Sequence, residues 1–411
     1  VIPLNEYVNI MPDYYYYCTE TDEVALQAVS DSGYLWGVHF ISHVPQGAYR
    51  GLGIRQDWLD KSNLEKPTTI AEMERVLFDF KEKYTNGHGP LSLLSVGTSR
   101  EGSLVGSYNV VGTNFMSSNG FLQKDGKVFF GPIEPGFKDY LTQMNDWWNK
   151  GLVFEEFTSN VTFFQTDQED VVLDRVGIFD YTYTYSSTYK AVSEDPDFRV
   201  VALTTPRLND EMEYSDIQVR LGQSKIRPEN SIVITGACSD VELACKYWNY
   251  EFTDDGIILS NYGIEGLTFN YNANNEPEYT ELFLETGGGN ISYAQKKWLA
   301  RDMGSFTIYT REVAPLDDDQ KAAESIWGKV GAGYLISTNV SMTADENTEF
   351  SNRISDIRTL CEENIPQFIM GTKNLEGDYD QFIQNIYNLG IEKCIELKQA
   401  AVDRYYDRTW K

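Results

Sequence analysis

The chain is organised around residues 52–84, LGIRQDWLDKSNLEKPTTIAEMERVLFDFKEKY. The first part of this stretch predicts a strand that passes into a short helical turn. Thr69 and Glu72 have the spacing of a capping box, in which each side chain satisfies a backbone N–H of the other residue. Apolar residues then recur with the period of a helix that has one buried face, at Ile70, Met73, Leu77, Phe80 and Tyr84. The pattern predicts a helix with one buried face, and it does not indicate a catalytic or binding site.

Length and charge limit the possible functions. A chain of 411 residues should hold two or three domains, and its core needs no disulfide or metal for stability. With 34 basic and 62 acidic residues the net charge is −28. Such a surface repels nucleic acid and anionic membranes, and it disfavours anionic ligands unless a basic pocket gathers them. We therefore expect no nucleic-acid partner.

The cysteines do not form a disulfide framework or a metal motif. There are five, without a CxxC pair, and we expect buried thiols at Cys18, Cys238, Cys245, Cys361 and Cys394. No apolar run approaches the roughly 18 residues that span a bilayer. The first residues do not have the pattern of a signal peptide.

Outside the central stretch, local patterns predict most of the remaining elements. Residues 1–12 read as the end of a strand, and Tyr14 to Tyr17 as a strand or turn with alternate rings buried. Asp125 and Gly126 predict a hairpin turn, and residues 231–235 a buried strand. Expected helices are 137–150, one capped by Ser239 and Glu242 that ends at Asp255 and Gly256, 349–364, 378–389 and 391–406.

Four stretches carry a resemblance to a known family. They are the sequence of residues 54–83, MNDWWNKGLV at 144–153, NYGIEG at 261–266, and the helix that begins with GIEK at 390 and ends with QAAVDRY at 405. All four occur in the same order in family 1 extracellular solute-binding proteins, in particular the lipoproteins that serve sugar ABC importers of Gram-positive bacteria. The chain resembles this family over nearly its whole length.

The resemblance implies an α/β fold of the periplasmic-binding-protein-like type II. Two lobes, each a mixed sheet flanked by helices, would enclose a cleft. By family topology, residues 1–44 with 228–310 would form the first lobe, and residues 45–227 with 311–411 the second lobe with its C-terminal helices. The opening phrase VIPLNEYVNIMP resembles a segment that the family reaches only after a signal peptide, a lipobox cysteine and part of the first lobe. We therefore expect the N-terminal part of that lobe to be missing.

The function that the resemblance implies is binding without reaction. We expect the extracellular receptor of an ABC importer, which binds an oligosaccharide or related glycan in the cleft and delivers it to the permease subunits. Such lobes close on the ligand by hinge bending. The resemblance further implies a monomer without cofactor, held at the cell surface only by a lipid anchor on the missing N-terminus.

Composition supports a sugar ligand. A sugar offers flat C–H faces and a ring of hydroxyls, which suit aromatic planes and forked charged or amide groups. The chain has 27 Tyr, 21 Phe and 8 Trp. In sugar-binding relatives, the segment that follows a strand such as residues 175–180 supplies an aromatic that stacks on a pyranose. Tyr181, Tyr183 and Tyr185, which alternate with threonines, are therefore the strongest candidates; the alternative is a tyrosine-rich strand edge that binds nothing.

Other candidates come from segments that the family places near the cleft, and from the loop at 97–120, which is rich in Gly, Ser and Asn. An ordinary loop is the alternative there. Aromatic members would stack on sugar, and charged members would hold hydroxyls. These further candidates are Trp36, Tyr49, Arg50, Arg100, Glu101, Tyr108, Tyr262 and Glu265.

Metal sites are poorly supported by the sequence. His39 and His43 have the spacing of two ligands on a helix, but the local pattern is a strand and Pro45 prevents a continuing helix. The loop from Asn270 to Tyr279, NYNANNEPEY, offers Asn and Glu oxygens to Ca²⁺, yet it lacks the aspartates and the glycine of an EF-hand loop. We predict no metal and leave calcium in that loop as the alternative.

Two rival functions remain open. A peptide or an amino-acid derivative could replace the sugar in the same fold, which would require a charged anchor for a terminus. A carbohydrate-active hydrolase needs only two carboxylates about 5–9 Å apart, and 62 acidic residues make some such pair inevitable. The motifs GxSxG, HExxH, Walker A and GxGxxG are absent, and neither His39, His43 nor His88 lies beside a nucleophile motif.

Overall fold

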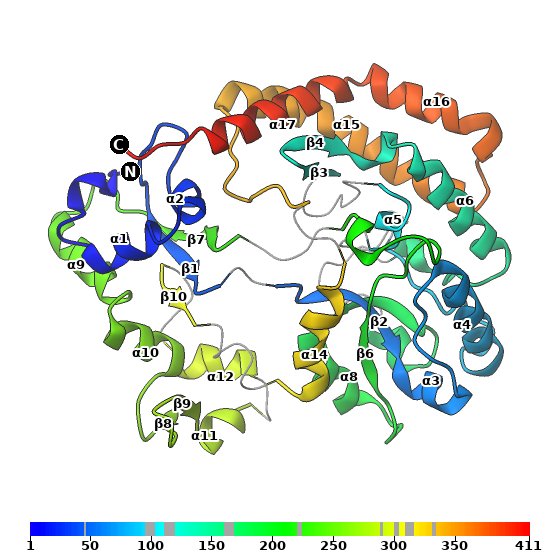
Figure 1. The fold of residues 1–411 in the computed structure, drawn as a ribbon, viewed down its shortest axis with the longest axis horizontal. Helices are drawn as coiled ribbons and strands as arrows, with labels where there is room; N and C mark the ends of the chain where they lie inside the picture. Colours follow the sequence, from blue (N-terminus) through cyan, green and yellow to red (C-terminus); the bar gives the residue numbers. More distant parts are fainter. Residues whose placement is uncertain are drawn as a thin grey trace.

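The computed structural model describes residues 1–44, 47–94, 103–110, 120–159, 168–219, 224–287, 291–299, 304–308, 316–330 and 334–411. The described helices and strands gather around two separate three-stranded sheets (Figure 1). None of the described helices is long and apolar enough to cross a membrane.

The first sheet lies on the left in Figure 1 and has β1 (Val38–Ser42) at its centre. β7 (Ile226–Ile232) pairs with it antiparallel, and β10 (Phe306–Thr307) pairs parallel. Helices and a small hairpin from two distant parts of the chain surround this sheet. They are α1 (Pro12–Cys18), α2 (Asp22–Ala28), α9 (Val241–Tyr250), α10 (Asp254–Tyr262), α11 (Glu281–Leu284), α12 (Ile291–Trp298), β8 (Phe269–Tyr271) and β9 (Pro277–Tyr279).

The second sheet has β2 (Arg50–Arg55) at its centre. β5 (Ile178–Thr182) and β6 (Val200–Leu203) flank it, both antiparallel. All six residues of β2 are buried, because the sheet is covered on both faces. Its cover includes α14 (Asp318–Trp327), which returns from late in the chain to pack on β2 and β6.

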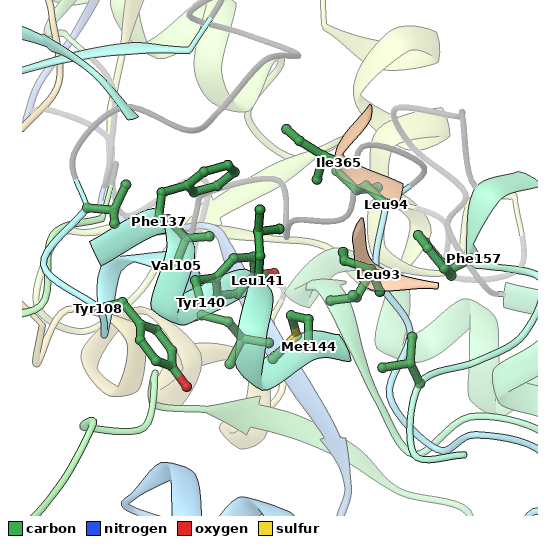
Figure 2. Packing of buried hydrophobic residues seen from close by; sticks show 14 of the residues in the cluster. Leu93, Leu94, Val105, Tyr108, Phe137, Tyr140, Leu141, Met144, Phe157 and Ile365 are labelled. Carbon is green, nitrogen blue, oxygen red and sulfur yellow. The ribbon is translucent and has the colours of Figure 1, made fainter. Parts of the chain in front are cut away.

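Helices form most of the structure around the second sheet. One group precedes or connects its strands: α3 (Gln56–Ser62), α4 (Ile70–Lys83), α5 (Ser103–Gly106), α6 (Gly136–Asn149), α7 (Gln168–Val172) and α8 (Ser186–Val192), with the hairpin β3 (Phe121–Lys124) and β4 (Lys127–Phe130). Three long helices close the chain: α15 (Ala344–Ile369), α16 (Leu375–Asn388) and α17 (Ile391–Tyr406). Figure 2 shows part of the hydrophobic cluster that joins both groups.

The central stretch of the sequence folds as its pattern predicts. Strand β2 passes directly into α3, whose end is marked by Asn63 in the left-handed conformation. Thr69 caps α4 by accepting a hydrogen bond from the Glu72 N–H. The Glu72 carboxylate accepts bonds from the backbone N–H and the hydroxyl of Thr68, one residue earlier than a standard box would place them. The expected hairpin turn and the four expected helices at 137–150 and near the C-terminus are also present.

Several local predictions for the first sheet's surroundings are wrong. Residues Leu4–Tyr7 form a 3₁₀ helix, and the tyrosine run lies in α1, where Pro12 occupies the first turn and Tyr14 and Cys18 bury one face. Asp240, not Ser239, caps α9, which ends at Tyr250. The expected end at Asp255 and Gly256 falls inside the next helix, which Thr253 caps. Val233 is 47% exposed, so residues 231–235 are not a buried strand.

The C-terminus returns from the second group of elements to the first. Helix α17 packs on α15, α16 and β4, and the residues after it then run beside α2. The Lys411 N–H donates to the Gly33 carbonyl (3.0 Å), and the Asn5 side-chain amide donates to the Lys411 carbonyl (3.0 Å). Both chain ends consequently lie next to each other in Figure 1.

Candidate functional site

Five of the predicted site residues meet at one end of the second sheet. Arg50 opposes Thr182 and Gly51 opposes Tyr181 in the β2–β5 register. The Tyr183 N–H donates to the Tyr49 carbonyl (3.3 Å), which continues the pairing beyond the strand. The structure therefore brings together the following: Tyr49, Arg50, Tyr181, Tyr183 and Tyr185.

Two of these tyrosines are packed against α14. Tyr181 is 2% exposed, and its ring lies edge-on to Trp327 with centroids 5.9 Å apart. Tyr183 stacks on the same indole at 6.4 Å and 20°. The Gln320 amide donates to the Tyr183 carbonyl (3.0 Å), and burial raises the pKa of the Tyr181 phenol. In this conformation the two rings therefore serve as packing.

The other residues of this group retain some surface or charge. Tyr49 and Tyr185 are half-buried, whereas Arg50 is only 6% exposed and its guanidinium lies 4.9 Å from the centre of the Tyr49 ring. Gly53 on the same strand faces Tyr181, and an added Cβ there would collide with that side chain. The glycine lets the tyrosine lie flat on the sheet, which fixes the position of the segment that carries Tyr183 and Tyr185.

Trp36 lies away from this group. It precedes β1, and the chain leaves the first sheet at the opposite end of that strand, after Ser42. The indole is 39% exposed, lies 5.3 Å from the Tyr34 ring and donates to the Ser30 hydroxyl (3.2 Å). Its exposure is compatible with ligand contact, but the structure does not bring it next to Tyr49 or Tyr185.

The NYGIEG segment has a structural role that the sequence reasoning missed. Tyr262 is 2% exposed and packs between Phe269 and Tyr279, whereas Glu265 is exposed. Asn261 is fully buried: its amide donates to the Phe306 carbonyl (2.7 Å), and its oxygen accepts from the Ile308 N–H (3.0 Å). It thereby fixes α10 to β10. An asparagine that follows the apolar run Ile257–Leu259 near the end of the helix was the available signal.

Tyr108 follows α5 and is buried beside Tyr140, with ring centroids 5.7 Å apart. Its hydroxyl points away from Phe137 (Figure 2), and within the described residues it has no hydrogen-bond partner. Burial raises the pKa of this phenol. Arg100 and Glu101, the other candidates from this part of the chain, lie outside the described residues.

The candidate metal ligands are engaged elsewhere. The His39 ring bonds the Ser231 hydroxyl (2.7 Å) and the Ala28 carbonyl (2.8 Å), and burial lowers its pKa to about 4. In the β8–β9 hairpin, the Asn272 side chain accepts from the Glu276 N–H (3.0 Å) and donates to the Glu278 carboxylate (2.8 Å). Over the described ranges, no group of three or more His, Cys, Asp or Glu could hold a metal ion.

Solved structures share this architecture over nearly the whole chain. A human-milk-oligosaccharide-binding solute-binding protein from Bifidobacterium longum infantis superimposes with a TM-score of 0.78 at 16% identity, covering 99% of this chain and 84% of the other. The alginate-binding protein AlgQ2 gives 0.71 at 20% identity, covering 98% and 81%. The chain has the two-lobed fold of solute-binding proteins. We call the part of the structure built around β1 the first lobe and the part built around β2 the second lobe.

A curated relative is the fructooligosaccharide ABC transporter substrate-binding protein FusA of Streptococcus pneumoniae. It is 20% identical over 375 residues, which are 86% of this chain. The match spans only 65% of the relative's own length. No family model matches the sequence. Similar proteins of this two-lobed fold are thus ABC-transporter sugar-binding proteins.

Proposed function

We propose that this protein is the extracellular substrate-binding receptor of an ABC importer, which binds an oligosaccharide or related glycan between its lobes and transfers it to the permease without reaction. The observation that carries the proposal is the meeting of Tyr49, Arg50 and Tyr185 at the end of β2, where the chain arrives from the first lobe. The related proteins, which bind fructooligosaccharide, human-milk oligosaccharide and alginate, support this ligand class.

The residues of this group suit different parts of a sugar. Half-buried Tyr49 and Tyr185 would cover C–H faces, and the Arg50 guanidinium would fork onto a pair of hydroxyls. Tyr181 and Tyr183 would hold this segment in place from behind. Arg100, Glu101 and Tyr108 from the second lobe, and Trp36, Tyr262 and Glu265 from the first, remain proposed contributors.

The setting of the protein is part of the same proposal. A family 1 lipoprotein of a Gram-positive bacterium would be anchored to the cell surface by a lipid upstream of this sequence, and it would act as a monomer. The division into residues 1–44 with 228–310 and 45–227 with 311–411 is likewise proposed. Two separate hydrophobic clusters support the division, except at its boundary: Ile226 of β7, in the range 45–227, belongs to the cluster around β1.

Calorimetric titration and thermal melting test the function. The panel contains fructooligosaccharides, human-milk oligosaccharides, alginate oligosaccharides and, as the rival class, short peptides. A bound glycan at 100 times its Kd should stabilise the native state by about 2.7 kcal/mol and raise the Tm. Tyr49→Ala and Tyr185→Ala should weaken binding, whereas Tyr271→Ala, an exposed tyrosine of the β8–β9 hairpin, should not.

Three results would contradict the proposal. A melting temperature that no glycan changes at saturation would remove the receptor function. Binding of peptides alone would favour the rival cargo in the same fold. Chromatographic detection of shortened glycans after incubation would show a hydrolase.

A further inference from the structure

The C-terminal residues form a network of hydrogen bonds between the lobes, in which each nitrogen of the Arg408 guanidinium has a partner. Arg408 follows α17, yet its side chain is only 2% exposed. Its Nε donates to Asp31 Oδ1 (2.8 Å) and its Nη1 to the Leu26 carbonyl (3.1 Å), both in the first lobe. Its Nη2 donates to the Asn339 carbonyl (2.9 Å) and the Ser341 hydroxyl (3.2 Å). One guanidinium thus links the end of α2 to the segment that leads into α15.

Arg404, one helical turn earlier, links the same two parts. Its Nη1 and Nη2 donate to the two oxygens of Glu346 on α15 at 2.8 and 2.5 Å. Its Nε donates to Asp31 Oδ2 (3.3 Å). The Glu346 carboxylate, held by Arg404, has a pKa below its usual range. Asp31 of the first lobe is therefore held by two arginines from the C-terminal helix region.

The last residues extend the contact along the first lobe. The Trp410 indole donates to the Ala25 carbonyl (3.1 Å) and lies edge-on to Tyr15, with centroids 5.1 Å apart. Lys411 pairs through its backbone with Gly33, whose φ of +80° and close approach to the Thr409 carbonyl leave no room for a side chain. We call Arg404, Arg408, Trp410 and Lys411, with their partners, the C-terminal clasp.

A chain crossing between the lobes is bound into the clasp. The Gln123 N–H of β3 donates to the Tyr334 carbonyl (2.9 Å), which fixes the start of this crossing in the second lobe. Asn339 then donates its side-chain amide to the Ile226 carbonyl of β7 (3.0 Å), and Ser337 bonds the Ser224 hydroxyl (3.0 Å). Because Arg408 holds the Asn339 carbonyl, the crossing, β7 and the C-terminus meet at one place.

We propose that the C-terminal clasp is the fixed pivot about which the two lobes move. A buried guanidinium whose partners come from both lobes cannot be separated from them without leaving charged and polar groups unpaired, so lobe movement must conserve this contact. The clasp confines the lobes to a narrow set of orientations, from which the ligand selects the closed one. The effect on ligand affinity rests on the proposed function, whereas the effect on lobe orientation does not.

Distance measurement between the lobes tests the pivot directly. Nitroxide labels at Tyr250→Cys in the first lobe and Tyr387→Cys in the second, both exposed positions, would report the separation by double electron–electron resonance. Cys238→Ser provides the background, because the other four native cysteines are buried. In the ligand-free protein we expect one narrow distance distribution. In Asp31→Asn and Arg408→Met we expect a broad one.

Affinity provides the second measurement, with the panel glycan that raises the wild-type Tm most. A wider range of orientations lowers the fraction of binding-competent protein, so the apparent Kd should rise by about tenfold. Arg358→Gln is the matched control, because the Arg358–Glu362 pair (2.6 Å) lies entirely within α15. It should leave both the distances and the Kd unchanged.

The outcomes separate the pivot from the proposed function. If Arg408→Met does not fold, Asp31→Asn decides, because it removes the negative charge that pairs with both Arg404 and Arg408 from a side chain that is 25% exposed. A folded Asp31→Asn protein with wild-type distances and Kd, or with only a lower Tm, would overturn the pivot. A wild-type protein that binds no glycan would overturn the proposed function. The ligand-free distance distributions of the wild type and the variants would still show whether the clasp is the pivot.

Discussion

The two lobes are stabilised in different ways. In the described residues, the main core of the second lobe contains forty-four buried hydrophobic residues, against sixteen in the core around β1. Among the residues that the structure describes, fifteen of the twenty-one exposed large hydrophobic side chains lie in the ranges 1–44 and 228–310. The second lobe is thus held by extensive apolar burial, whereas the first buries less and leaves more apolar surface exposed.

The first lobe compensates with buried hydrogen bonds between distant segments. Asn249 of α9 accepts from the backbone N–H groups of Asp13 and Tyr14 (3.0 and 3.1 Å), and Gln27 of α2 accepts from Ile226 of β7 (2.8 Å). His39 and Asn261 make similar bridges. We therefore expect large-to-small substitutions to reduce stability most in the second lobe, and the loss of single polar groups to reduce it most in the first.

The largest effect should follow Trp58→Ala in the second lobe. Trp58 is 2% exposed, packs on Phe80 and Tyr84 at 5.1 and 5.0 Å, and lies 4.3 Å from the Arg55 guanidinium. Its truncation leaves a cavity and should lower the free energy of unfolding by about 3–5 kcal/mol in urea melts. Trp36 in the first lobe is half-exposed, so Trp36→Ala should lower the free energy of unfolding far less. Equal losses would refute the contrast in packing.

The next effect is a pH dependence that arises in the first lobe. The pKa of His39 is lowered to about 4 by burial, so below about pH 6.5 the unfolded chain takes up a proton that the folded protein does not. The contribution of neutral His39 to the free energy of unfolding is fully present above that pH, and it should fall by about 3 kcal/mol as the pH approaches 4. His39→Gln should flatten this part of the pH profile, while exposed His43→Gln should keep it. A profile that His39→Gln does not alter would exclude His39 as the cause.

A smaller loss is expected when α10 is separated from β10. Asn261→Ala leaves the Phe306 carbonyl and the Ile308 N–H without their partner, which should cost roughly 1–3 kcal/mol. The control is Asn274→Ala in the exposed turn of the β8–β9 hairpin, where we expect a change within about 0.5 kcal/mol. Similar urea midpoints for the two variants would show that the buried bridge contributes little.

The smallest expected effect is the loss of a helix N-cap, which should lower the free energy of unfolding by the same amount in both lobes. Thr69 caps α4 in the second lobe, and Thr21 caps α2 in the first by accepting from the Val24 N–H (3.2 Å). Capping is local, so Thr→Ala at either position should cost about 1 kcal/mol in thermal melts, and Thr→Ser should restore most of it. A much larger loss at Thr21 would mean that α2 depends on its cap to hold the clasp.

Sequence patterns predicted the second lobe better than the first. The strand and helix from Ile54 to Lys83 have one clear apolar period and a recognisable cap, so local signals and tertiary packing agree there. In the first lobe, the tyrosine run and the boundary between α9 and α10 were misread. Rings pack around Tyr14 and Phe252 from distant segments, and no local pattern specifies such contacts.

The candidate site was predictable in part for the same reason. Tyr49, Arg50 and Tyr185 lie together because β2 pairs with β5, two strands that the sequence indicated. Burial of Tyr181 and Tyr183 under Trp327 could not be foreseen: the acidic run Asp317–Asp319 indicates a helix start, but no local pattern shows that this helix packs on the second sheet. The clasp also escaped notice, because Asp31 and Arg408 are nearly four hundred residues apart.

Residue 411 lies beside the first residues of this sequence, which makes the segment 1–411 suitable for rearrangement. In an engineered form of this segment, a short linker from Lys411 to Val1 would join them at the pivot, and new ends could be opened at the β3–β4 turn, where Asp125 and Gly126 already have positive φ. Reporter proteins attached at such new ends would sit on the second lobe close to the pivot, because Gln399 of α17 donates to the Gly126 carbonyl (2.8 Å) and accepts from the Val128 N–H (2.8 Å). The optical signal of such a circular permutant would report whether the clasp itself changes when the lobes move.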